Sequence, residues 1–231
     1  MAGSGFHPSH LKGGGVIEAT ARYIAGNVVI EKGEIVEYGR TGIKALTQGT
    51  DFDDPAFGAA GEAHDGVTAG RQSGTEILVY DNPLTVFKHI PKQLSTTTGG
   101  SSTLWTDSSL TAADDVFNGG KVVIVSTNSI AGFNVGDVLS ITDFANSGGV
   151  CTVSGAGGTI AAGMTGYIYP GFAAITVYGF DLNSDGMMID LDTAGGESLI
   201  IEDVTWDAQL KEATVYCRLR LHQLGNDAAA K

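Results

Sequence analysis

Cysteine is almost missing from this sequence. Cys151 and Cys217 are the only two among 231 residues, which is too few for a disulfide framework, and they lack the paired spacing of a zinc site. We therefore interpret both as small buried apolar residues. Proline is also scarce, with five residues, and the glycines follow no period of three. These shortages exclude a disulfide-rich scaffold and a collagen-like chain.

Basic residues are in short supply as well. The sequence has 13 Lys and Arg residues and 26 Asp and Glu residues, so the formal net charge is −13. Such a surface repels phosphate backbones and anionic lipid headgroups, and we predict no direct nucleic-acid partner and no membrane partner. The same charge keeps a concentrated protein soluble until it meets a specific docking surface, although an ordinary acidic cytosolic protein has a similar composition.

A long apolar run is the third absence. No charged residue occurs between Asp143 and Asp181, but glycines, Ser and Thr residues and Pro170 interrupt this stretch. No run of about 20 apolar residues remains for a spanning helix, and we interpret the stretch as buried or interfacial β structure. The start, Met1–Gly5, lacks the basic and apolar regions of a secretory signal, so we expect synthesis in the cytoplasm.

Glycine, by contrast, is abundant, with 34 residues. Short runs of β-branched and aromatic residues recur between glycine-rich turns, as in a sandwich or barrel. The clearest strand is Ala213 to His222, where apolar and polar residues alternate with a period of two. No comparable helical period exists, and we predict a mainly β fold: an antiparallel barrel or sandwich of short strands with a flexible N-terminal arm and long loops. The other predicted strands are 28–30, 35–36, 43–46, 77–80, 84–90, 122–125, 138–141, 150–153, 174–178, 187–191 and 199–201.

The chain divides into an arm and a β region. Residues 1–15 contain the Gly13-Gly14-Gly15 run and offer little apolar surface, which predicts a flexible arm that stays a tail or orders on a neighbouring subunit. Residues 16–231 form the β domain, either as one unit or as two subdomains, 16–92 and 103–231, joined by a Ser/Thr/Gly-rich segment. In the second half, Thr111 and Asp114 have capping-box spacing and Gly119 follows, which predicts one or two helical turns.

The common sites of enzyme chemistry do not match this sequence. Gly119–Val122 fails the template of a phosphate-binding loop, and the Gly155–Gly158 loop is followed by glycines and a proline where a dinucleotide-binding helix must begin. His7 and His10 lie three residues apart in the arm, a spacing that we attribute to chance rather than to a metal site. We therefore assign no catalytic, cofactor-binding or metal-binding residue and no cofactor, and we expect the protein not to be an enzyme.

Acidic residues form two short clusters. Asp51, Asp53 and Asp54 make one, and Asp114 and Asp115 make the other. We interpret both as solvated loop carboxylates, with paired-carboxylate hydrolysis as the competing hypothesis.

The segment from Asp181 to Asp192 has two interpretations. Oxygen-bearing side chains at Asp181, Asn183, Asp185 and Asp192, with Gly186 at the sixth position, nearly match a calcium-binding loop. The same residues fit a hairpin turn, in which Asn and Asp bond the local backbone and glycine takes a positive φ. We favour the hairpin because the flanking residues predict strands, whereas a calcium-binding EF-hand needs helices.

Several features together resemble structural proteins of tailed-bacteriophage virions, most of all a head decoration (cement) protein. They are the Gly-rich start at 1–15, the Gly26-Asn27-Val28-Val29 and Gly136-Asp137-Val138-Leu139 segments, and the uncharged β stretch that ends near Phe180. The resemblance implies a non-enzymatic capsid protein of the virion, made in the host cytoplasm. It also implies a homo-oligomer, commonly a trimer, that docks on the major capsid protein and stabilises the head.

Two alternatives remain within the sequence. The loop from Gln48 to Gly74 and the Ser/Thr-rich segment also suit a tail or adaptor component. A carbohydrate-binding β module would use Trp105 or Trp206 to stack on sugar rings, although we expect both side chains to be packed.

Overall fold

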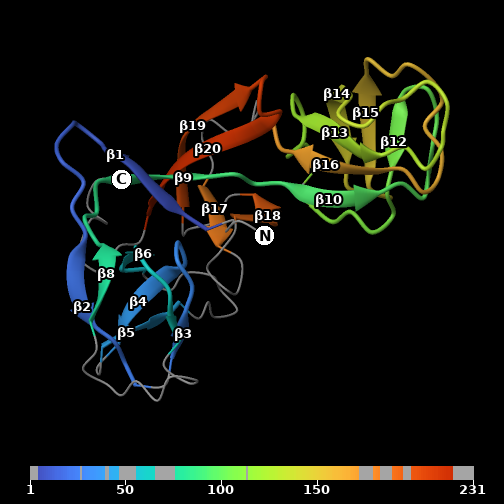
Figure 1. Cartoon of the computed structure of the whole chain (residues 1–231). Helices are drawn as coiled ribbons and strands as arrows, with labels where there is room; N and C mark the ends of the chain where they lie inside the picture. Colours follow the sequence, from blue (N-terminus) through green and yellow to red (C-terminus); the bar gives the residue numbers. More distant parts are fainter. Residues whose placement is uncertain are drawn as a thin grey trace.

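The structure is a computed structural model that describes residues 5–26, 28–39, 42–46, 56–65, 76–112, 114–171, 179–182, 189–194 and 199–220. Within these ranges the chain forms strands and turns but no helix, and all strands that pair in sheets are antiparallel. The predicted mainly β fold is confirmed. Figure 1 shows the strands gathered in three regions, with the central sheet between two lobes.

One lobe is a seven-stranded sheet that curls into a half-barrel. Its strands come from one continuous part of the chain, drawn green to orange in Figure 1. The first and last strands of the sheet are consecutive, because only Thr97 and Thr98 separate β10 from β11. In spatial order the strands are β10 (Gln93–Thr96), β16 (Thr165–Tyr169), β13 (Lys121–Ser126), β14 (Val138–Ala145), β15 (Val150–Ser154), β12 (Leu104–Thr106) and β11 (Gly99–Gly100).

Alternating burial explains why this sheet curls around a core. Buried and partly exposed residues alternate along β13, β14 and β15, so one face of each strand is apolar and turns inward. Trp105 is fully buried at the centre, and Phe117 and Phe144 meet edge to face with ring centroids 4.8 Å apart.

The central sheet has six strands and joins the two ends of the chain. Strand β20 shows the predicted alternation, because Ala213, Val215, Cys217 and Leu219 are all buried. Since β9 pairs with β20, the half-barrel is an insertion between two strands of this sheet. The order is β1 (His7–Leu11), β9 (Thr85–His89), β20 (Glu212–Leu219), β19 (Leu199–Asp207), β17 (Gly179–Leu182) and β18 (Ile189–Ala194).

The third sheet has five strands whose two edges meet. Ile24, which follows β2, bridges to Ile43 in β5, and the Ala25 amide donates to the Ile43 carbonyl at 2.9 Å. A Cβ at Gly42 would lie 2.5 Å from the Tyr23 carbonyl oxygen, so this closure needs a glycine. The order is β2 (Thr20–Tyr23), β8 (Glu76–Tyr80), β6 (Gly58–Ala60), β4 (Ile35–Gly39) and β5 (Gly42–Ala45), with a separate pair, β3 (Val29–Ile30) and β7 (His64–Asp65).

The predicted N-terminal arm needs correction. From His7 to Leu11 the chain forms strand β1, which pairs with β9 at the edge of the central sheet. Phe6 is 1% exposed and stacks on the ring of His89 at 4.8 Å. One phenylalanine therefore supplies the apolar anchor that the glycine-rich composition of residues 1–15 concealed.

The predicted linker and helix also need correction. The Ser/Thr/Gly-rich segment contributes β10, β11 and β12 to the half-barrel, so it does not separate subdomains 16–92 and 103–231. Residues 114–119 form successive turns instead of a helix. Asp115 has φ 66° and its amide donates to the Phe144 carbonyl, so tertiary pairing overrides the local capping signal.

Candidate interaction surface

The sequence-predicted residues of chemical interest are mostly packed. Cys151 and Cys217 are buried, as predicted. Burial raises the pKa of each thiol to about 12, with a further contribution from Asp107 at Cys151 and from Glu202 at Cys217. Both thiols therefore stay protonated at neutral pH, which is unsuited to nucleophilic attack.

Neither tryptophan stands free in solvent. Trp105 is fully buried and its Nε1 donates to Ser95 Oγ at 2.9 Å. Trp206 is partly buried and meets Tyr169 edge to face at 5.6 Å. The expectation that both are packed is confirmed, and Trp105 has no face open to a sugar ring.

The Asp181–Asp192 segment lies mostly outside the described residues. Asn183 and Asp185 fall there, as do the side chains of Asp181 and Asp192. The flanks are described and form β17 and β18, which pair antiparallel, as a hairpin requires and an EF-hand does not. The Asp51, Asp53 and Asp54 cluster also falls outside. Within the described ranges, no group of three or more His, Cys, Asp or Glu side chains is placed to hold a metal ion.

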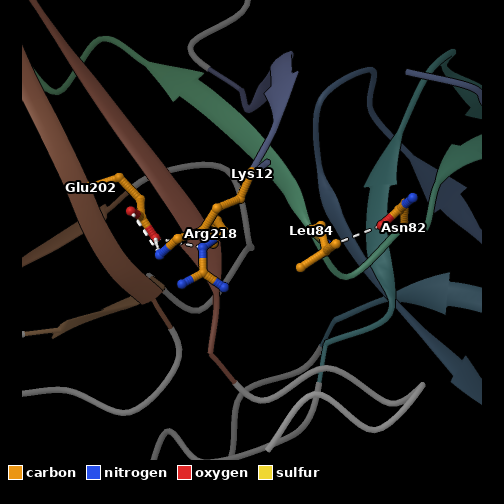
Figure 2. A network of polar contacts seen from close by, with 5 residues as sticks. All are labelled: Lys12, Asn82, Leu84, Glu202 and Arg218. Carbon is orange, nitrogen blue, oxygen red and sulfur yellow. Dashed lines mark hydrogen bonds and ion pairs between the residues drawn. The ribbon is translucent and has the colours of Figure 1, made fainter. Parts of the chain in front are cut away.

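Polar side chains gather instead on the outer face of the central sheet. A turn at Asn82–Thr85 begins this arrangement, because Asn82 Oδ1 accepts the Leu84 amide at 2.9 Å and the Leu84 carbonyl accepts the Lys12 amide at 2.9 Å. The Lys12 backbone is thereby held beside β9. Figure 2 shows the Lys12 side chain reaching across to Glu202 and Arg218.

Glu202 is shared between two cations. Lys12 Nζ lies 3.0 Å from Glu202 Oε1, and Arg218 Nε donates to the same oxygen at 2.5 Å. Burial on its own would raise the pKa of Glu202, but hydrogen bonds from Arg218 and Lys12, together with their charges, lower it below its ordinary value of 4.5. This carboxylate is therefore ionised at neutral pH and paired with both cations.

A cleft of about 240 Å³ opens on the same face. His7 and Lys88 stand opposite each other on β1 and β9, and Lys88 stands opposite Tyr216 on β20, so they share one face. Its described lining contains basic, hydroxyl and apolar side chains but no carboxylate, and we call it the basic cleft: Gly5, His7, Lys88, His89, Ile90, Leu210 and Thr214.

An apolar rim borders the basic cleft. It is formed by Leu210, which lies in the turn between β19 and β20, lines the cleft and is 70% exposed. The next residue, Lys211, donates from Nζ to the Gly136 carbonyl of the half-barrel at 2.5 Å. This bond links the turn that carries the rim to the half-barrel.

Comparison with known proteins adds no assignment. No family model, no curated protein and no solved structure matches the chain. Within the described residues, no helix is long and apolar enough to span a membrane. The proposed function therefore rests on the basic cleft and its rim.

This surface could not be predicted from the sequence, because three distant segments build it. His7 was noted only as half of a chance histidine pair, and Lys88 and Leu210 carried no local motif. The alternation of β20 did place Thr214 and Tyr216 on the face opposite the buried residues. The pairing of β1 with β9 was the missing information, because it brings His7 beside Lys88.

Proposed function

We propose that the protein is a non-enzymatic structural protein that assembles with copies of itself on a larger particle. The observation that carries this proposal is the basic cleft on a strongly acidic protein, bordered by Leu210, which is 70% exposed. Exposed apolar side chains beside polar groups are typical of protein–protein contact surfaces.

The specific form of this proposal is a head decoration protein of a tailed phage. The resemblance of the glycine-rich start and the Gly-Asn/Asp-Val segments supports it. In this role the chain would be located in the virion, form a homo-oligomer, commonly a trimer in the family it resembles, and dock on the major capsid protein. A tail or adaptor position is the alternative within the same class.

Light scattering on the purified full chain tests the assembly proposal. We expect a stable oligomer, and Leu210→Asp should shift it toward the monomer, since a charge in the rim opposes its burial. Leu94→Asp is the matched control, because Leu94 is also well exposed, at 61%, but lies on β10 of the half-barrel. A monomer at every concentration would contradict the proposal.

Mass spectrometry of purified particles tests the location. The chain should appear in many copies per head if it decorates the capsid, and in few copies if it belongs to the tail or an adaptor. Its absence from particles would contradict the phage assignment while leaving self-assembly to the scattering result.

A further inference from the structure

The basic cleft holds a cation that the described chain leaves unpaired. The ion pairs of the described residues are Lys12 and Arg218 with Glu202, Arg22 with Asp81, Lys44 with Glu37, and Lys92 with Glu212. Lys88 is exposed, and no described carboxylate lies within 4.0 Å of its Nζ. The cleft adds the imidazole of His7 and the Thr214 hydroxyl, so its chemistry suits a carboxylate.

The half-barrel, in contrast, has unpaired acidic side chains and few basic ones. Lys121 is the only basic residue between Gln93 and Gly171, and its Nζ donates to Ser140 Oγ at 2.8 Å. We call the carboxylates of Asp114, Asp115 and Asp143 the acidic turn. All three residues are exposed, and no described basic side chain lies within 4.0 Å of their carboxylate oxygens.

Backbone contacts hold the acidic turn in place. The Asp115 amide donates to the Phe144 carbonyl at 3.3 Å, next to Asp143, and Asp114 Oδ1 accepts the Asn146 amide at 3.0 Å. Asp115 keeps φ at 66°, and its Oδ1 accepts from Asn118 Nδ2 at 2.8 Å. These bonds leave the carboxylates room for further donors, because each carboxylate has about four acceptor positions.

Charge complementarity connects the two surfaces. The cleft offers donors and a net positive side chain, whereas the acidic turn offers acceptors only, and each is short of a partner of opposite sign within the described chain. Two different patches that fit each other on identical chains make a head-to-tail contact, which closes into a ring when the rotation allows.

We propose that the basic cleft of one copy binds the acidic turn of a second copy, with Lys88 and His7 facing Asp114 and Asp115. The inference rests on the proposed self-assembly and names the two faces that meet. The apolar rim at Leu210 would cover the edge of this contact and exclude water from the charge pairs, which strengthens them.

Charge reversal with rescue in a single chain tests the pairing. Lys88→Glu, and separately the double variant Asp114→Lys with Asp115→Lys, should each raise the dissociation constant by about tenfold or more. In the triple variant that carries all three changes, every interface again pairs opposite charges. This variant should therefore restore association, whatever the number of copies in the ring. Analytical ultracentrifugation on the full chain measures each constant.

Lys32→Glu is the matched control, because Lys32 is exposed and outside both surfaces. It should leave the dissociation constant unchanged, and circular dichroism should confirm that every variant folds. The proposed pairing is wrong if the oligomer persists in either charge-reversal variant, or if the triple variant does not restore it. Neither outcome contradicts the proposed function. An unaltered chain that stays monomeric at every concentration contradicts the proposed self-assembly itself, and the pairing with it.

Discussion

Asp107 is a buried carboxylate that joins separate segments inside the half-barrel. It is 3% exposed, and its carboxylate accepts from Ser95 Oγ at 2.7 Å, the Thr96 amide at 2.9 Å, and the Ser109 amide and Oγ at 3.0 and 2.6 Å. Burial on its own would raise the pKa of Asp107, but the hydrogen bonds from Ser109, Ser95 and Thr96 outweigh it and lower the pKa below 3.8. The network also fixes Trp105, because Ser95 Oγ accepts its indole N–H.

We expect Asp107→Ala to lower the free energy of unfolding by about 3 kcal/mol at pH 7, since buried donors lose their acceptor. Urea denaturation measures this loss, and Asp143→Ala, at an exposed position, should change stability by less than about 0.5 kcal/mol. Because the folded pKa lies below 3.8, the contribution of Asp107 is complete above that value and is lost as the pH falls through the folded pKa. A gap between variant and unaltered chain that widened in acid would contradict this account.

Single residues were predictable where burial follows from residue type. The two cysteines and Trp105 were placed correctly, because small apolar and large aromatic side chains favour the core. The burial of Asp107 was not predicted, because Asp is usually exposed. Its neighbours in the sequence do not indicate that Ser95, twelve residues earlier, is its partner. Its environment depends on β10 and β12 meeting in space.

Some strands could be predicted from the sequence and others could not. The alternating segment of β20 was predicted because its period of two is visible in the sequence. The short strands β6, β7, β10 and β11 were missed, because they consist largely of small, polar or glycine residues that pair only where longer neighbours present a free edge. Strand β1 was missed for the same reason, and its anchor, Phe6, is a single residue outside the strand. Strand β12 was missed because its three residues are too few to show a period of two.

We expect Phe6→Ala to release β1 from the central sheet. The substitution removes a fully buried ring stacked on His89 and should cost about 3 to 4 kcal/mol. Hydrogen exchange should show faster exchange at the amides of β1, with smaller changes in the half-barrel. His10→Ala, at an exposed position in the same strand, serves as the control; equal exchange in the two variants would argue against an anchoring role for Phe6.

At the scale of the whole molecule, side chains from both parts join the half-barrel to the central sheet. Trp206 meets Tyr169, Lys92 Nζ lies 3.4 Å from Glu212 Oε1, and the same Nζ lies 4.8 Å from the centroid of the Tyr167 ring. Burial, followed by the nearby Glu212 and Tyr167, raises the pKa of Tyr169 to about 12. The sequence predicted a β protein of one or two units but placed the boundary at the Ser/Thr-rich segment, because low apolar content there resembles a linker.

We expect Trp206→Ala to loosen this junction, because it removes the ring that covers Tyr169. The stability loss should be about 2 kcal/mol, less than for a fully buried tryptophan. The pKa of Tyr169 should fall from about 12 toward its ordinary value of 10.0 as water reaches the phenol. Ultraviolet titration of the tyrosines reports this change, and Trp206→Phe, which keeps an aromatic ring, should preserve most of the raised pKa.

The insertion of the half-barrel between β9 and β20 also sets an order of events during folding. Residues 93–171 can complete their own sheet from local pairings, whereas β9 gains its partner β20 only from the far end of the chain. A folded half-barrel shortens the effective loop that this last pairing must close. Until then one edge of β9 stays open, and the excess negative charge of the chain repels such edges on different molecules from each other.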